Sequence, residues 1–327
     1  MYISFTLGDA DMIFSFLVLF LLVYTNGFSD APNSVACAIS SHAVEVKAAI
    51  RLAALFDMLG VLLFSLISPS VAYTCGSIVK IPNEGRYAIL ASMSTALIWA
   101  LLAWKFGIPT SESHAMSAAI SGAAFFLGGE INMQAWGRIF TGFFLFSALA
   151  FFISPLTARI SEALLRKRSR RCRISFLSSA ETLLCLLCSF MHGAQDGQKF
   201  IGMIMLFSGE STPTPLSVIS CATVLSFGTL TCSKRIIKTT AFETVRLNMN
   251  ESFASDLTSF FLMLTASLLG IPLSTSNVKC SAMIGTQSLS SHRAPNVKKA
   301  VFTMAVWILT FPCCFIIGGA LSYLYSI

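Results

Sequence analysis

Apolar runs of about 20 residues recur along the chain and are separated by short polar loops. A helix of that length crosses the hydrocarbon of a bilayer, and the runs lack the alternation typical of a membrane β-barrel. The pattern therefore predicts an all-α polytopic membrane protein with roughly 10–12 membrane segments. The expected segments are Met12–Ser41, a return span ending near Pro69, Tyr87–Trp104, Phe106–Phe126, Ile139–Pro155, Ser178–Phe207, Leu216–Cys232, Phe253–Leu269, Gly270–Leu289 and a last span ending near Tyr323.

The first run is interrupted by Asn-Gly-Phe-Ser-Asp-Ala-Pro-Asn (26–33), which places Asp30 at membrane depth. An ionisable side chain there costs about 2.5–3.5 kcal/mol on insertion scales, so by default it marks a substrate or ion path. Gly27 and Pro32 flank the aspartate and predict a break in the helix. The competing interpretation is a buried ion pair, for which Asp30 has no basic residue nearby in the sequence.

A similar segment, His-Gly-Ala-Gln-Asp-Gly-Gln-Lys (192–199), occurs in the second half and again places an aspartate, Asp196, between glycines. Here the ion-pair interpretation has a partner, because Lys199 lies three residues further along a helix. Two such segments in corresponding places predict an internally repeated transporter with its binding site at the interface of the repeats.

A second motif is duplicated, as Gly-Ile-Pro-Thr-Ser-Glu-Ser (107–113) and Gly-Ile-Pro-Leu-Ser-Thr-Ser (270–276). Hydroxyl residues that favour a helix N-cap follow each proline, so each motif predicts a half-helix whose free N–H groups and dipole form an anion site. The alternative is that these hydroxyls bond back to carbonyls of their own helix. The candidate residues for binding a small tetrahedral oxyanion are Thr110, Ser111, Ser113, Ser274, Thr275, Ser276, Asp30 and Asp196.

An anion can bind beside two aspartates only if a coupling cation offsets their charge. Carboxylate and amide oxygens suit Na⁺, and a carboxylate can instead accept a proton. The candidate cation ligands are Asn26, Asp30, Asn33, Gln195, Asp196 and Asn277. Partly protonated phosphate can donate a hydrogen bond to a carboxylate, whereas fully ionised sulfate cannot, so the arrangement favours phosphate.

Composition supports the membrane assignment, because 55% of the residues are hydrophobic and 11% are charged, against about 25% charged in soluble proteins. The net charge is +7, and the basic residues lie in short loops between spans. Positive-inside topology explains this placement without a nucleic-acid partner. The basic block 166–173 predicts a cytoplasmic linker at 164–175 between a first membrane repeat, 1–163, and a second, 176–327. An odd number of crossings in each half then predicts inverted repeats and two external termini, with the first run a retained helix.

The segments GFSDAPNSVACAIS (27–40), SFMHGAQDGQKFIGMI (189–204), GIPTSESH and LLGIPLSTSNV resemble the duplicated signatures of the inorganic phosphate transporter (Pit) family. The resemblance covers nearly the whole chain. It implies Na⁺- or H⁺-coupled symport of inorganic phosphate across a bacterial inner membrane, with no cofactor, and leaves a homodimer open. The chain departs from the family pattern at Gln195, where Asn is usual, at Pro32, where a small residue is usual, and at Asn277, where His is common.

Two other functions remain as alternatives at this stage. A sulfate or metal-phosphate carrier of the same family would use the same motifs. A membrane-embedded enzyme would use Asp30 and Asp196 as a carboxylate pair, but it needs a nucleophile or a metal set such as HExxH, which the sequence lacks. The sequence thus predicts a transporter and not an enzyme.

Overall fold

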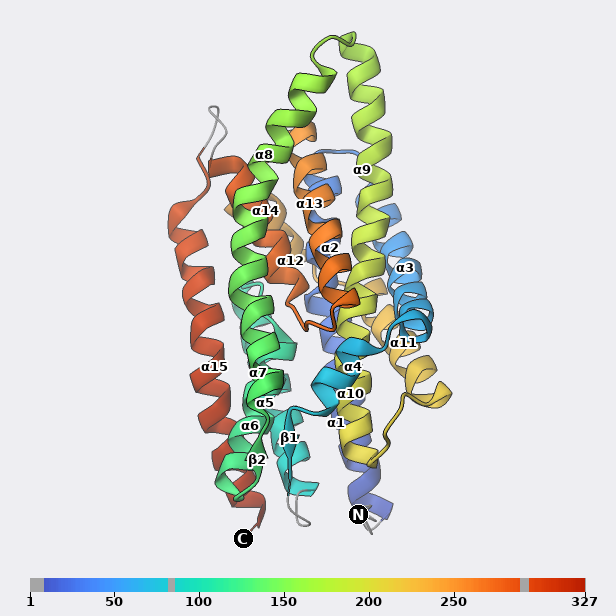
Figure 1. Cartoon of the computed structure of the whole chain (residues 1–327). Coiled ribbons are helices and arrows are strands. Elements are labelled where there is room, and N and C mark those ends of the chain that lie inside the picture. Colours follow the sequence, from blue (N-terminus) through green and yellow to red (C-terminus); the bar gives the residue numbers. More distant parts are fainter. Residues whose placement is uncertain (1–8, 82–85, 289–293, 327) are drawn as a thin grey trace.

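The computed structural model describes residues 9–81, 86–288 and 294–326 as a long helical bundle (Figure 1). Helix α1 begins, and helix α15 ends, at the end of the bundle opposite the α8–α9 connection (Figure 1). The first half contains α1 (Asp9–Ser29), α2 (Ala31–Ser40), α3 (Val46–Ile67), α4 (Ser70–Gly76), β1 (Val79–Lys80), α5 (Arg86–Phe106), α6 (Glu112–Phe126), β2 (Glu130–Ile131), α7 (Met133–Phe140), the π-helical η1 (Thr141–Phe146) and α8 (Ser147–Leu165). The second half contains α9 (Arg170–His192), the π-helical η2 (Gly193–Gly197), α10 (Gln198–Ser208), α11 (Pro215–Leu230), α12 (Lys234–Lys238), the π-helical η3 (Thr239–Thr244), α13 (Met249–Leu268), α14 (Thr275–Ser288) and α15 (Val297–Ser326).

Six helices of the described residues are long and apolar enough to cross a membrane, which confirms a helical multi-pass fold. A seventh candidate is α11 together with the segment Lys234–Thr244, which are bent by 62°. The six are Phe14–Ser40, Val46–Ile67, Ala88–Phe106, Met133–Leu165, Arg170–Ser208 and Val297–Tyr325. Among the described residues, the single strand pair is the antiparallel β1–β2 ladder, in which Val79 lies opposite Ile131. It links the segment after α4 to the segment after α6.

Two predictions about individual segments were wrong. The segment 178–207 is not broken at Asp196, because η2 keeps the chain helical from Arg170 to Ser208, with Gly193 and Gly197 in ordinary right-handed backbone. The span that starts near Ile139 does not end at Pro155, which lies inside α8. A proline removes one helical hydrogen bond, a loss that a membrane helix tolerates where neighbouring helices pack on the freed carbonyl.

The basic linker predicted at 164–175 stays a prediction, and its last residues lie in helix α9. Helix α9 begins at Arg170, where the Ser169 hydroxyl accepts a hydrogen bond from the Cys172 N–H.

In the first motif the interruption is confined to Asp30, between α1 and α2, and the Asp30 N–H still donates to the Asn26 carbonyl at 2.8 Å. The motif helices therefore carry their polar residues without exposing much backbone.

The breaks occur instead at the duplicated Gly-Ile-Pro turns. Gly107 and Gly270 have φ of +68° and +66°, a left-handed conformation that a side chain disfavours, and each ends a helix before the proline. The resulting pairs, α5 with α6 and α13 with α14, pack side by side. The α5–α6 hairpin lies toward one end of the bundle and the α13–α14 hairpin toward the other, so the two turns approach the middle from opposite ends (Figure 1).

The two halves of the chain are interleaved. Helices α1 and α6 of the first half pack against α11 and α15 of the second, and α9 and α14 of the second pack against α3 and α8 of the first. Glycines allow these contacts: a Cβ on Gly122 would lie 1.9 Å from the Phe315 carbonyl oxygen, and one on Gly285 would lie 2.0 Å from that of Phe151. Phe151 is the residue whose carbonyl loses its helical partner at Pro155, so Gly285 packs where the helix is already open.

We expect Gly122→Ala and Gly285→Ala each to lower the stability of the folded protein by about 1–3 kcal/mol, because the new methyl group meets a backbone oxygen. Thermal unfolding in detergent measures the effect. Gly137→Ala is the matched control, since a Cβ there meets nothing within 4 Å. Melting temperatures of all three variants equal to that of the unsubstituted protein would contradict the close packing.

Candidate transport site

The two half-helices begin at serine caps. Ser111 precedes α6, and its hydroxyl accepts from the His114 N–H at 3.3 Å. Ser274 precedes α14, and its hydroxyl accepts from the Asn277 N–H at 3.2 Å. The remaining N–H groups of each first turn lie at the Gly-Ile-Pro turns, inside the protein. The structure thus places two helix N-termini in the buried middle of the bundle.

The ammonium of Lys199 joins the two turns. Lys199 is 1% exposed, and its Nζ lies 3.1 Å from Ser113 Oγ on α6 and 2.5 Å from the Leu273 carbonyl oxygen before α14. Its third partner is Asp196 Oδ1, at 2.5 Å. The ion pair considered from the sequence is therefore present, and its cation also holds both hairpins.

Three buried carboxylates surround one amide. Asn26 Nδ2 lies 3.2 Å from Asp30 Oδ2, 3.0 Å from Glu112 Oε2 and 3.2 Å from Asp196 Oδ2. Glu112 is 1% exposed and also accepts from the Ser29 hydroxyl at 2.5 Å. Glu112 was not among the predicted site residues, although it lies in the first Gly-Ile-Pro motif and the rule that selected Asp30 applies to it equally.

Asp30 has hydroxyl and amide partners and no basic partner among the described residues. Ser276 donates its hydroxyl to Asp30 Oδ1 at 2.9 Å and accepts from Asn33 Nδ2 at 2.7 Å. Thr240 of η3 in turn donates to Asn33 Oδ1 at 2.9 Å. This arrangement parallels the second motif, where Lys199 in place of Asn33 reaches Ser113 in place of Ser276.

Several buried polar atoms at this centre have no hydrogen-bond partner in the described chain. They are Asn26 Oδ1, Thr275 Oγ1, and both amide atoms of Asn277. Native proteins pair the large majority of such atoms, so their gathering near the start of α14 indicates a ligand site. Thr110 is also buried, in the turn before α6.

The Gln195 side chain forms its hydrogen bonds with the end of α13 and the turn after it. Its Nε2 lies 2.8 Å from Ser267 Oγ and 3.4 Å from the Ile271 carbonyl oxygen, and its Oε1 accepts from the Leu273 N–H at 3.4 Å. All three contacts are on α13 or on the turn that follows it. The side chain of this predicted cation ligand thus packs against the turn that contains Leu273, whose carbonyl oxygen contacts Lys199.

A second polar chain reaches Asp196 from helix α3. Asp57, fully buried, lies 3.0 Å from His192 Nδ1 and accepts from the Thr229 hydroxyl at 2.6 Å. His192 Nε2 lies 3.5 Å from Asp196 Oδ2. Asp57 was also missed from the sequence, because it occurs singly within an apolar run and outside either duplicated motif.

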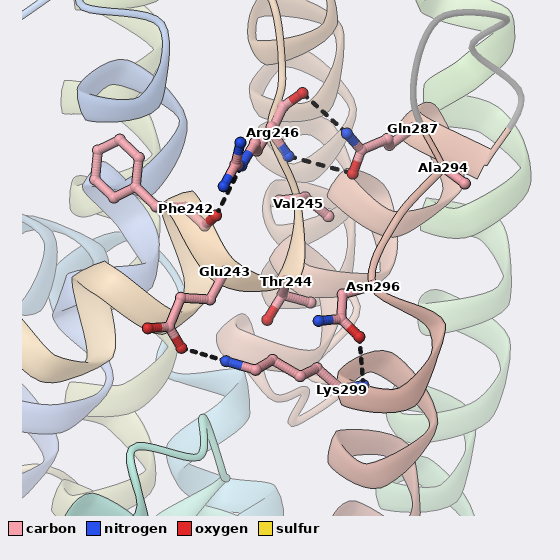
Figure 2. Close-up of a pocket in the computed structure, with 9 residues that line it drawn as sticks. All are labelled: Phe242, Glu243, Thr244, Val245, Arg246, Gln287, Ala294, Asn296 and Lys299. Atoms are coloured by element: carbon pink, nitrogen blue, oxygen red, sulfur yellow. Dashed lines mark hydrogen bonds and ion pairs between the residues drawn. The ribbon is translucent and has the colours of Figure 1, made fainter.

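A pocket of ≈ 430 Å³ lies at the ends of α14 and α15, away from these residues. Figure 2 shows Gln287 facing the backbone of Arg246, and Lys299 facing Glu243. The lining residues are Phe242, Glu243, Thr244, Val245, Arg246, Gln287, Ala294, Asn296 and Lys299, and none of them is a predicted site residue. The contacts tie η3, which carries Thr240 against Asn33, to the neighbouring helices.

A multi-pass helical protein in which two half-helix N-termini meet buried carboxylates has the architecture of a membrane transporter. The chain belongs to the phosphate transporter family, whose family model matches residues 26–318. This membership confirms the resemblance found in the duplicated motifs, and the similar proteins below are named as transporters and not as enzymes.

The similarity extends over nearly the whole chain. A probable low-affinity inorganic phosphate transporter of Bacillus subtilis is 27% identical over 312 residues, which cover 92% of each chain. A Rhizobium meliloti protein of the same description is 29% identical over 338 residues, covering 96% of this chain and 98% of its own. A solved structure described as "The sodium-dependent phosphate transporter" matches with a TM-score of 0.83 at 18% identity, over 97% of this chain and 99% of that one, and shows a common fold.

We expect Gln195→Ala to lower the stability of the protein by about 1–3 kcal/mol, because it leaves the buried Leu273 N–H and Ser267 hydroxyl short of a partner. Thermal unfolding in detergent is the measurement. The matched control is Gln134→Ala, whose side chain is exposed on α7. Equal melting temperatures for the two variants would show that Gln195 does not position the turn.

Proposed function

We propose that this protein is a symporter that couples the uptake of inorganic phosphate to Na⁺ or H⁺. The observation that carries the proposal is the meeting of the α6 and α14 N-termini with Asp30, Glu112 and Asp196 around one amide. The names of the similar proteins support inorganic phosphate as the substrate, and the name of the solved structure includes dependence on sodium.

The charge of the centre supports coupling to cations. The three carboxylates of Asp30, Glu112 and Asp196 lie around the Asn26 amide, and the ammonium of Lys199 pairs with Asp196, which leaves two negative charges when all are ionised. A phosphate anion is repelled by such a centre until cations or protons offset the excess. The binding of cations and the binding of the anion therefore depend on each other, and a symporter requires this dependence.

Cations would bind on the carboxylate side of the centre. Oxygens are offered there by Asn26, Asp30, Glu112 and Asp196, and Asn26 Oδ1 has no hydrogen-bond partner among the described residues. We also propose the amide oxygens of Asn33 and Asn277 as cation ligands, whereas Gln195 acts on the site by positioning the turn after α13. Both Na⁺ and H⁺ remain compatible with this set.

Phosphate would bind between the two helix starts. The N–H groups and hydroxyls there belong to Thr110, Ser111, Ser113, Ser274, Thr275 and Ser276. Lys199 supplies a positive charge at the same place, and Asp30 and Asp196 supply acceptors for a protonated phosphate oxygen. Those acceptors favour phosphate over sulfate and make the sulfate carrier the weaker alternative.

We further propose that the basic α8–α9 connection faces the cytoplasm of a bacterial cell. The opposite placement of the beginning of α1 and the end of α15 then puts both termini outside (Figure 1). The hairpins that enter from opposite ends, and the matching glycine contacts of Gly122 and Gly285, support an inverted repeat. The homodimer stays a prediction.

The first test is uptake of labelled phosphate and of labelled sulfate by proteoliposomes under separately imposed Na⁺ and pH gradients. We expect gradient-driven accumulation of phosphate and not of sulfate. Asp30→Asn should fold normally and lose accumulation, because it removes a charge that has no basic partner among the described residues. Asp196→Asn should also lose about 3–5 kcal/mol of stability, because it leaves Lys199 buried without its carboxylate.

Glu210→Gln, at an exposed position, controls for loss of a carboxylate and should transport normally. Uptake is normalised to folded protein, and unfolding is followed in detergent. Full gradient-driven uptake by Asp30→Asn would exclude its role in coupling. Failure of the unsubstituted protein to accumulate phosphate under either gradient would exclude the proposed function itself.

A further prediction separates anion contacts from helix caps. Ser276→Ala should raise the apparent KM for phosphate about tenfold or more, because a hydrogen bond to a charged group contributes about 1.5–3 kcal/mol. Ser111→Ala should in addition cost about 0.5–2 kcal/mol of stability, since its hydroxyl caps α6. Ser220→Ala is the control, because that hydroxyl bonds a carbonyl of its own helix. An unchanged KM in Ser276→Ala would show that Ser276 serves Asp30 alone.

A further inference from the structure

A second buried polar cluster lies beside the transport site and is not used by the function proposed above. Glu181 of α9, Asp256 of α13 and Cys37 of α2 are all fully buried, and their carboxylate oxygens and sulfur lie within 4.8 Å of one another. Lys279 of α14, 1% exposed, forms an ion pair with Asp256 Oδ1. Its ammonium also lies 3.4 Å from the Ser34 carbonyl oxygen.

The carboxylates of this cluster are short of hydrogen-bond donors. Neither Glu181 oxygen has a partner in the described chain, and Asp256 Oδ2 also has none. An ionised carboxylate without donors in a buried setting is strongly disfavoured. Two carboxylates against one ammonium leave one negative charge, which a single proton on Glu181 cancels.

A proton fits this cluster better than a metal ion does. The Lys279 ammonium already occupies one side of Asp256 and would repel a cation placed against the other side. The third ligand is a thiol, which suits soft metals and not Na⁺. A carboxylic acid at Glu181, by contrast, becomes a donor that can rotate toward the unpaired Asp256 Oδ2.

In the part of the chain that the structure describes, the surroundings contain no other group that would take over this charge. The charged groups that face Glu181 are Asp256 and Lys279, and the thiols nearby are Cys37, Cys185 and Cys188. Helix α3 packs on α9 with alanines at this level, Ala49 and Ala53, next to Cys185. The acidic residue of α3, Asp57, is already engaged by His192 and Thr229.

Two helices connect this cluster to the transport site. On α14, Ser276 donates to Asp30, and Lys279, three residues further on, pairs with Asp256. Helix α2 starts directly after Asp30 and carries Cys37 into the cluster. A movement of α14 that releases Ser276 from Asp30 therefore also acts on the partner of Asp256.

We propose that Glu181 and Asp256 together hold one exchangeable proton and form a second, proton-specific coupling site of this transporter. On loading, Glu181 takes a proton from a hydronium ion of the aqueous phase, which becomes water, and Glu181 becomes a carboxylic acid. On release the proton passes back to a water molecule, which becomes hydronium, and the carboxylate is restored. The role in coupling rests on the proposed phosphate symport, whereas the binding of the proton does not.

The test has one readout on the purified protein and one on transport. Infrared spectroscopy over a pH series should show a carboxylic-acid C=O band that is missing in Glu181→Gln and present in Glu162→Gln, an exposed control on α8. In proteoliposomes, Glu181→Gln should lose the extra phosphate accumulation that a proton gradient produces in the unsubstituted protein, and Glu162→Gln should keep it.

The outcomes separate the two proposals. If the band is lost but no variant accumulates phosphate, the proton site stands and the symport proposal fails. If Glu181→Gln keeps the band and the response to the proton gradient, the proton site is excluded, and loss of Na⁺ activation in its place would assign the cluster to Na⁺. Should Glu181→Gln not fold, Glu181→Asp decides: a shifted midpoint for the band supports the site, and an unchanged midpoint overturns it.

Discussion

The requirement to satisfy one buried ammonium organises the middle of this protein. Lys199 has no access to water and takes its three partners from three places: Asp196 on its own helix, Ser113 at the start of α6 and the Leu273 carbonyl before α14. A buried cation without such partners costs several kcal/mol, so the hairpins must meet at this point. Gln195, one residue before Asp196, accepts from the Leu273 N–H and so holds the Leu273 carbonyl within reach of the Lys199 ammonium.

The interleaving of the halves explains how so polar a centre is kept from lipid. Each motif helix packs on a helix of the other half, α1 on α11 and α9 on α3, through glycines that bring backbones into contact. Gly60 approaches the Phe190 carbonyl, and Gly228 approaches that of Tyr24. In a membrane, close packing of this kind replaces the hydrophobic effect as the source of helix association. The carboxylates are thereby enclosed by protein on all sides.

Excess negative charge is the property shared by the two polar centres. The transport site holds three carboxylates, of which Asp196 pairs with Lys199, and the neighbouring cluster holds two, of which Asp256 pairs with Lys279. In each, an ammonium pairs with one carboxylate, and a bound cation or a proton would offset the charge of the rest. Because α14 carries both Ser276 and Lys279, the two centres share a moving part if that helix shifts during transport.

The sequence by itself determined the helical membrane fold, the duplicated motifs and the family, because length, apolarity and repeated spacing are local properties of the chain. Asp30 and the start of α14 were predicted for that reason. Glu112 and Asp57 became site residues only in the tertiary structure, which brings them to Asn26 and His192 from distant helices. Whether a glycine or proline breaks a helix was likewise decided by packing, since neighbouring helices satisfy the backbone. The pairing of helices across the halves depends on contacts far apart in sequence, which no local pattern encodes.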